Sequence, residues 1–205
     1  MPRARKLPKS FFLQDTVTVA RALLGCVLWR RLDHGELLAA RIVETEAYLG
    51  ANDLASHARR GLRSPRNESM YAEGGHAYVY FTYGMHWCMN VVTQEADIAE
   101  AVLLRAAEPL RGIEAMRERR PKAKKEHDLM NGPGKICMAL DIDRRLDGAD
   151  LRGDVLWLTE RDIEVRDEDI AVSARIGIDN SGDAAAWPLR FFLHGHRHVS
   201  AYRHV

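Results

Sequence analysis

Residues 41–48, Arg-Ile-Val-Glu-Thr-Glu-Ala-Tyr, constrain the fold more than any other segment of the chain. Successive side chains of an extended strand point to opposite faces. Alternate residues would therefore form a polar and an apolar face: Ile42, Glu44, Glu46 and Tyr48 on the first, and Val43, Thr45 and Ala47 on the second. Two carboxylates and a phenol are costly to bury without partners, but they are useful on the floor of a pocket. The segment thus predicts a sheet with one face on a core and the other at a functional site.

The rest of the pattern predicts a strand-rich single domain over residues 1–205, with residues 1–6 as a flexible basic arm. Asp15 is a candidate N-cap for a helix that ends before Gly25. Residues 26–31 and 36–48 form a predicted hairpin, and residues 50–75 a functional loop with short helical turns. Further strands are predicted at 78–81, 102–105, 155–158, 171–176 and 189–193, and further helices at 112–120 and 136–140.

The sequence also bears on the cellular location of the protein and on the state of its cysteines. No apolar stretch approaches the roughly 20 residues of a membrane-spanning helix, and the first residues lack the apolar segment of a signal peptide. We therefore expect a cytoplasmic protein, nucleoid-associated if bacterial, with no membrane partner. Cys26, Cys88 and Cys137 are far apart and have apolar neighbours, so buried thiols are expected rather than disulfides or a metal site.

Charge is divided unevenly along the sequence although the net charge is only +1. Residues 141–183 hold 13 acidic and 6 basic side chains, a balance of −7, so the remainder of the chain carries +8. The basic residues gather near the N-terminus, between Arg59 and Arg66, and between Arg111 and Lys125. A basic face with an acidic rear would suit a polyanionic partner, although charge runs are commonly just solvated surface.

The chain has no P-loop, nucleophile elbow, dinucleotide fingerprint or HExxH sequence. In order along nearly the whole chain, its motifs instead resemble those of the alkyladenine (3-methyladenine, methylpurine) DNA glycosylase family. The segments that carry the resemblance are 41–48, His57, Ser-Pro-Arg-Asn at 64–67, Tyr-Val-Tyr at 78–80, Tyr-Gly-Met at 83–85, Cys-Met-Asn at 88–90, Val-Leu-Leu-Arg-Ala at 102–106, Glu-Pro-Leu at 108–110 and Gly-Pro-Gly-Lys at 132–135. The resemblance implies an α+β domain with a curved, mostly antiparallel sheet, open-barrel-like at its core and surrounded by helices and long loops.

The resemblance also implies an enzyme, a monofunctional DNA-3-methyladenine glycosylase without a cofactor. Such an enzyme acts in base-excision repair: it flips a damaged purine out of double-stranded DNA, hydrolyses the N-glycosidic bond and leaves an abasic site. The implied substrates are 3-methyladenine and 7-methylguanine, with hypoxanthine and ethenoadenine as further candidates. We expect the protein to act as a monomer.

Bond cleavage develops positive charge on the sugar, so a carboxylate near C1′ can stabilise that charge and activate water. The family's general base is the second glutamate of Glu-Thr-Glu, which corresponds to Glu46. Arg105 is the second catalytic candidate, expected to hold the water and the phosphate side of the flipped nucleotide. The structural alternative is that both glutamates form salt bridges with arginines. Glu44 matches no role.

The remaining site residues are also implied by the resemblance. Tyr48, His57 and Tyr80 correspond to residues of the base pocket, and Asn90 to the residue that crowds the exocyclic amino group of normal guanine. Tyr83 corresponds to the side chain that enters the minor groove and fills the gap left by the flipped nucleotide.

Contacts to the DNA backbone are expected from three residues near these motifs, Arg66, Met85 and Lys135. Two segments, His86-Trp87 and residues 179–187, depart from the family pattern.

Three alternating histidines near the C-terminus, His194, His196 and His198, could share one strand face and bind a metal. The family needs no metal and its members do not share this histidine pattern, so we expect no functional metal site in the protein. Two rival functions stay open: a catalytically silent module that binds damaged DNA, and a metal-dependent hydrolase that uses these histidines.

Overall fold

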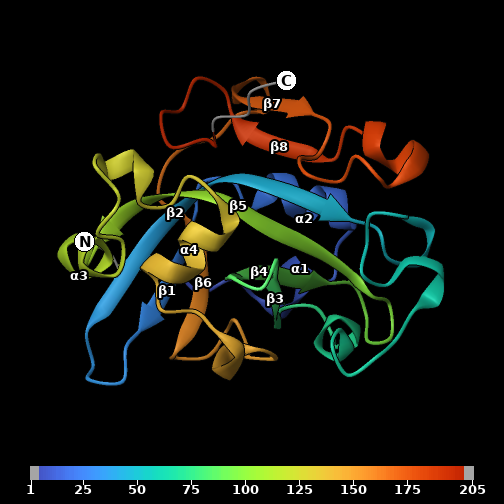
Figure 1. The fold of residues 1–205 in the computed structure, drawn as a ribbon, viewed down its shortest axis with the longest axis horizontal. Coiled ribbons are helices and arrows are strands. Elements are labelled where there is room, and N and C mark those ends of the chain that lie inside the picture. Colours follow the sequence, from blue (N-terminus) through green and yellow to red (C-terminus); the bar gives the residue numbers. More distant parts are fainter. Residues whose placement is uncertain (1–4, 201–205) are drawn as a thin grey trace.

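Two long neighbouring strands, β2 (Leu37–Tyr48) and β5 (Glu100–Arg111), form the centre of the sheet (Figure 1). The computed structural model describes residues 5–200. The sheet is antiparallel and has the order β3-β4-β5-β2-β1-β6, with β8 paired to β2 and β7. On the edge of β2 opposite β5, β1 pairs with residues 37–41 and β8 with residues 44–46. The sheet is not closed, and the predicted single α+β domain is confirmed.

The other strands are β1 (Cys26–Arg31), β3 (Ala77–Thr82), β4 (His86–Thr93), β6 (Leu156–Arg161), β7 (Ile170–Ser173) and β8 (Arg190–Leu193). The α-helices of the described residues are α1 (Lys9–Phe12), α2 (Thr16–Ala22), α3 (Ile113–Arg119) and α4 (Pro133–Ala139). The predicted hairpin across residues 32–35 is confirmed by the pairing of β1 with β2. Residues 50–75 contain only short 3₁₀ turns, as predicted.

Three strands of the structure differ from the prediction. Strand β4 was not predicted, and β5 is far longer than the predicted segment 102–105. Both strands carry long runs of buried residues, so neither shows the alternation of polar and apolar side chains by which a half-exposed strand is recognised. The predicted strand 171–176 ends at Ser173, and residues 174–181 leave the sheet as a loop.

The face of β2 that carries Thr45 and Ala47 packs beneath α2. Asp15 caps this helix by accepting a hydrogen bond from Thr18 N, as predicted, and Thr45 Oγ1 donates to Ala20 O at 2.9 Å. The expected strict alternation along β2 is interrupted, because its register with β5 shifts on both sides of Glu44. A β-bulge of this kind inserts an extra residue and redirects the side chains around it.

The expected flexible arm at residues 1–6 is wrong for Lys6, which is held against β6. Residues 1–4 lie outside the described part of the chain, but Lys6 forms a β-bridge with Thr159 and its ammonium contacts Asp154 at 2.7 Å. The three cysteines are buried free thiols, in agreement with the sequence. Within residues 5–200, every helix is too short or too polar to cross a membrane.

Candidate active site

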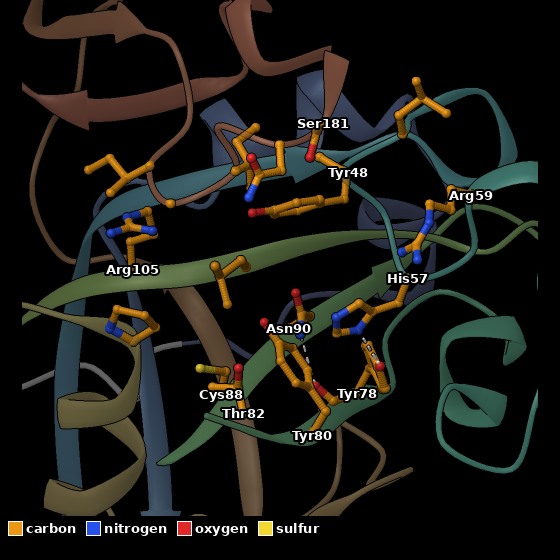
Figure 2. Close-up of a pocket in the computed structure, with 18 of the residues that line it drawn as sticks. Tyr48, His57, Arg59, Tyr78, Tyr80, Thr82, Cys88, Asn90, Arg105 and Ser181 are labelled. Atoms are coloured by element: carbon orange, nitrogen blue, oxygen red, sulfur yellow. Dashed lines mark hydrogen bonds between the residues drawn. The ribbon is translucent and has the colours of Figure 1, made fainter. Parts of the chain in front are cut away.

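A cavity of about 680 Å³ lies where β2, β3, β4 and β5 meet the loops at residues 50–75 and 174–181 (Figure 2). Figure 2 shows Tyr48 on one side of this cavity and Tyr80 and Asn90 on the other. Among the expected site residues, those that line it are Tyr48, His57, Tyr80, Tyr83, Asn90 and Arg105. The fold thus gathers residues from distant parts of the sequence around one space of a size typical for ligand pockets.

Glu46 lies one layer behind the cavity wall and is completely buried. Its Oε1 accepts a hydrogen bond from Ile176 N at 2.7 Å and lies 3.3 Å from Arg105 Nη1. Its Oε2 accepts from the Tyr48 hydroxyl at 2.9 Å. Tyr48, Arg105 and Ile176 all line the cavity, so the carboxylate is separated from it only by its own hydrogen-bond partners.

Burial raises the pKa of Glu46 above its ordinary value, because the charged form loses its water of hydration. The positive charge of Arg105 and the hydrogen bonds from Ile176 and Tyr48 act in the opposite direction. Burial and the neighbouring Glu46 charge raise the pKa of Tyr48 well above its ordinary value. The phenol therefore stays protonated and donates its hydrogen to Glu46. Glu46 is thus a buried carboxylate with a raised pKa beside a cavity, which is the environment expected of a general base.

Arg105 connects the two glutamates of β2. Its Nε donates to Glu44 Oε1 at 3.2 Å, and its Nη1 lies beside Glu46. Arg105 occupies an irregularity in the pairing of β5, because Glu44 is opposite Ala106 while the next residue, Thr45, is opposite Leu104. Bulges near active sites commonly re-aim a side chain in this way. The guanidinium thereby reaches both carboxylates and still lines the cavity.

Glu44, for which the sequence gives no role, is completely buried and accepts hydrogen bonds from several elements of the fold. Its Oε1 accepts hydrogen bonds from Arg190 Nε at 2.6 Å and Ser200 Oγ at 2.7 Å, in addition to the one from Arg105. Its Oε2 accepts from Ser200 N at 2.7 Å. The carboxylate thus joins β2, β5, β8 and the C-terminal segment. The expected alternative of salt bridges to arginines is present at both glutamates, with two arginines at Glu44 and Arg105 alone at Glu46.

Aromatic rings form the opposite wall of the cavity. The ring of His57 meets Tyr80 edge-on with centroids 4.5 Å apart, and Tyr78 stacks on Tyr80 at 5.3 Å. Tyr78 Oη and His57 Nδ1 are 2.7 Å apart. Asn90 is nearly buried, and its Nδ2 donates to Tyr78 O at 3.2 Å. Tyr78 is a cavity residue to which we assigned no role from the sequence, although its alternation with Tyr80 places both rings on one strand face.

Burial, together with the positive charges of the nearby Arg66 and Arg59, lowers the pKa of His57 to about 4. The imidazole is therefore neutral at neutral pH. It can donate one hydrogen bond and accept one, with the proton's position set by the partner of Nδ1.

The turn between β3 and β4 presents Tyr83 to solvent. Tyr83 and Gly84 both have positive φ, 51° and 66°, and Met85 N donates to Thr82 O at 3.1 Å. Two successive positive φ values are typical of a tight hairpin turn, where glycine is favoured. Tyr83 is 80% exposed and Met85 68% exposed. A large apolar pair at the tip of a hairpin beside a cavity is available for contact with another molecule.

Two of the residues expected to contact the DNA backbone, Arg66 and Lys135, already form hydrogen bonds within the protein. Arg66 Nη2 donates to Phe81 O at 3.2 Å, which fixes the arginine against the end of β3. Lys135 Nζ contacts Asn131 Oδ1 at 2.6 Å.

Contrary to our expectation, the acidic stretch at residues 141–183 is not confined to the face opposite the basic one. One of its members, Asp179, lines the cavity.

The loop at residues 174–181 contributes functional positions that sequence reasoning missed. Arg175 forms a completely buried ion pair with Asp53, and its guanidinium lies over the ring of Tyr48 at 4.6 Å. The next residue, Ile176, supplies the backbone N–H bound to Glu46. No local motif marks this loop, since its partners lie more than a hundred residues earlier in the chain.

The C-terminal histidines lie outside the cavity. His196 and His198 lie near Glu108, whereas His194 is exposed and apart from this group. Burial lowers the pKa of both His196 and His198, and the charge of Glu108 opposes the shift. The structure therefore gives no support to a hydrolase that would use these residues within the cavity.

Comparison with known proteins identifies the family. Residues 10–197 match the family described as Methylpurine-DNA glycosylase. A protein of Bdellovibrio bacteriovorus is 46% identical over 196 residues, which cover 95% of this chain and 98% of that protein. The human protein named DNA-3-methyladenine glycosylase is 44% identical over 209 residues, which cover 98% of this chain and 70% of that protein. The chain belongs to the methylpurine-DNA glycosylase family.

Proposed function

We propose that the protein is a DNA glycosylase that removes alkylated purines, 3-methyladenine and 7-methylguanine, from double-stranded DNA by hydrolysis. Family membership supports the general activity. The observation that carries the mechanism is the buried Glu46 carboxylate, which lies beside the cavity. Among residues 5–200, its Oε2 accepts a hydrogen bond only from the phenol of Tyr48, a cavity residue.

Glu46 would act as the general base. A water molecule that reaches the carboxylate has to pass the groups that separate Glu46 from the cavity, which are Tyr48, Arg105 and Ile176. The oxygen of this water forms a bond to C1′ of the sugar as the bond from C1′ to the base nitrogen breaks. Glu46 takes a proton of the water, and the electron pair of the broken bond leaves with the base.

Cationic bases suit this site better than neutral ones. A base such as 3-methyladenine carries a positive charge that is neutralised on departure, so no acid is needed. Hypoxanthine or ethenoadenine would need a proton from the enzyme, but His57 is neutral and Tyr48 and Tyr80 have raised pKa values. We therefore propose alkylated purines as the main substrates and neutral lesions as slower ones.

The aromatic wall and the exposed hairpin support base flipping. A purine in the cavity could lie between Tyr48 and the rings of His57 and Tyr80, while Asn90 rejects the amino group of normal guanine. Tyr83 would occupy the space left in the duplex. Its exposure and its fixed turn support this role, because the ring is presented without a prior conformational change.

The test is an excision assay on duplexes that carry 3-methyladenine, 7-methylguanine or hypoxanthine at one position. Wild-type protein and Glu46→Gln are incubated with each duplex, with and without EDTA, and alkali-labile abasic sites are counted. We expect abasic product from wild type with or without EDTA, and none above background from Glu46→Gln. No product from any lesion would exclude the glycosylase, and lesion binding without product would favour the silent binding module. Product that is lost with EDTA would favour the metal-dependent hydrolase.

Tyr83→Ala tests the flipping step separately. We expect affinity for lesion-containing duplex to fall by about tenfold or more, since unstacking costs a few kcal/mol, with affinity for undamaged duplex nearly unchanged. Val172→Ala is the control, because Val172 is an exposed apolar residue outside the cavity. Equal loss of affinity for the two duplexes, measured by fluorescence anisotropy, would contradict the proposed role of Tyr83.

A further inference from the structure

The side chain of His198 is completely buried, and neither of its ring nitrogens has a hydrogen-bond partner among residues 5–200. Buried polar atoms almost always have a partner, because leaving one unsatisfied costs free energy. A fully enclosed imidazole with two unsatisfied nitrogens therefore requires an explanation.

Two further ligand groups converge on this histidine. His198 Nδ1 lies 4.0 Å from Glu108 Oε1, and His196 Nε2 lies 3.5 Å from Glu108 Oε2. One possible ligand atom from each of the three residues lies within 4.8 Å of the others. Ligand atoms around a tetrahedral zinc ion are about 3.4 Å apart, given metal–ligand distances near 2.1 Å. Small side-chain movements would bring the three atoms to that spacing.

The charges around Glu108 are compatible with a bound cation. Glu108 Oε2 is in contact with Arg41, but Arg41 also forms two hydrogen bonds with Asp162, at 2.6 and 2.7 Å. Arg41 therefore keeps a carboxylate partner if Glu108 turns toward a metal. Glu108 Oε1, the oxygen nearer His198, can become a ligand while Oε2 stays with Arg41.

We propose that Glu108, His196 and His198 form a binding site for a Zn²⁺ ion. Two imidazoles and one carboxylate are a ligand set that zinc accepts, and a water molecule could complete the coordination. His196 and Glu108 are each about one-fifth exposed, which gives the ion a path from solvent.

The site would fasten the C-terminal segment rather than take part in base excision. Glu108 lies five residues along β5 from Leu103, the partner of Glu46, or roughly 16 Å at the rise of a strand. The ion would join β5 to the segment that contains Ser200, and Ser200 donates two hydrogen bonds to Glu44. Metal binding should therefore stabilise the folded protein and leave the chemistry at Glu46 unchanged.

The experiment uses full-length protein without a histidine tag, treated with EDTA and then dialysed. Zn²⁺ is titrated by calorimetry, Co²⁺ is titrated by visible absorption as a probe of coordination, and melting temperature is recorded with and without Zn²⁺. The variants are His196→Ala and Glu108→Gln, with His194→Ala as the matched control because that histidine is in the same segment but outside the cluster. His196 is half-buried, so its replacement is tolerated more easily than that of His198.

We expect stoichiometric Zn²⁺ binding, intense Co²⁺ absorption and a higher melting temperature for wild type and His194→Ala. Affinity should fall by at least about tenfold in His196→Ala and in Glu108→Gln. Circular dichroism establishes that each variant is folded before titration. Absence of saturable binding to wild type, or an equal loss of affinity in His194→Ala and His196→Ala, would overturn the proposal.

Discussion

Glu44 and Glu46 are two residues apart on one strand and both are completely buried, yet their surroundings differ sharply. Glu44 accepts four hydrogen bonds, from two arginines and from the backbone and side chain of Ser200. Glu46 lies behind a cavity wall, and its Oε2 is held by a single phenol. A buried carboxylate whose oxygens already accept several hydrogen bonds stabilises the fold. A buried carboxylate beside a cavity that can still accept another hydrogen bond is available for chemistry.

The largest expected effect is on catalysis by Glu46→Gln. We expect the single-turnover rate on 7-methylguanine to fall by at least about 10²-fold, because the general base is removed. Stability should be unchanged or higher, since burial raises the pKa of Glu46 and the charged form is therefore disfavoured in the folded state. Quench-flow kinetics and urea unfolding measure the two quantities. A stable variant with wild-type rate would remove Glu46 from the mechanism.

The second expected effect, on stability, comes from Glu44→Gln. Replacing this carboxylate leaves Arg190 and Arg105 buried with less negative charge, and breaking a buried ion pair costs roughly 3–5 kcal/mol. We expect the midpoint of urea unfolding to fall much further than for Glu46→Gln. Equal losses of stability in Glu44→Gln and Glu46→Gln would contradict the assignment of Glu44 to stability and Glu46 to catalysis.

The third expected effect is on the pH dependence of the rate. Because the pKa of Glu46 is raised above 4.5, the base becomes protonated and the rate falls as pH decreases through that higher value. Tyr48→Phe removes a hydrogen bond that lowers this pKa, so the acid limb of the profile should move to higher pH while the ring remains in the wall. The pH profile of kcat/KM on 7-methylguanine measures the shift. An acid limb that stays in place or moves to lower pH would contradict the assignment of this limb to Glu46.

The smallest expected effect is from Ser200→Ala. The change removes one of the four hydrogen bonds to Glu44 and leaves the backbone donor in place. We expect a loss of about 1.5–3 kcal/mol in the free energy of unfolding, the usual contribution of a hydrogen bond to a charged group, and an unchanged excision rate. A large loss of rate without loss of stability would show that the two carboxylates act as one unit.

Local signals predicted the elements whose ends are marked by a helix cap or a turn. The α2 cap at Asp15 and the β1–β2 hairpin follow from sequence signals that act within a few residues. Strand β4 and most of β5 were missed because both are covered on both sides, and a strand without a solvent face has no alternating pattern.

The residues of the candidate site also fall into two groups, those predicted from the sequence and those found only in the structure. The residue types and their approximate grouping came from the sequence, through the resemblance of motifs around Glu46, His57 and Tyr80. The roles of Arg175 and Ile176 did not, because these residues act on Tyr48 and Glu46 from a loop about 130 positions away.

Local sequence patterns suffice to place two carboxylates and a phenol on one strand, and to show that aromatic segments accompany them. Only the tertiary structure distinguished the two carboxylates. The bulge at Arg105, the Ser200 contact 156 residues from Glu44 and the Ile176 contact 130 residues from Glu46 together set how many donors each carboxylate has. Hydrogen-bond saturation and burial depend on contacts between distant segments, and these two quantities decide whether a buried charge holds the fold together or carries out chemistry.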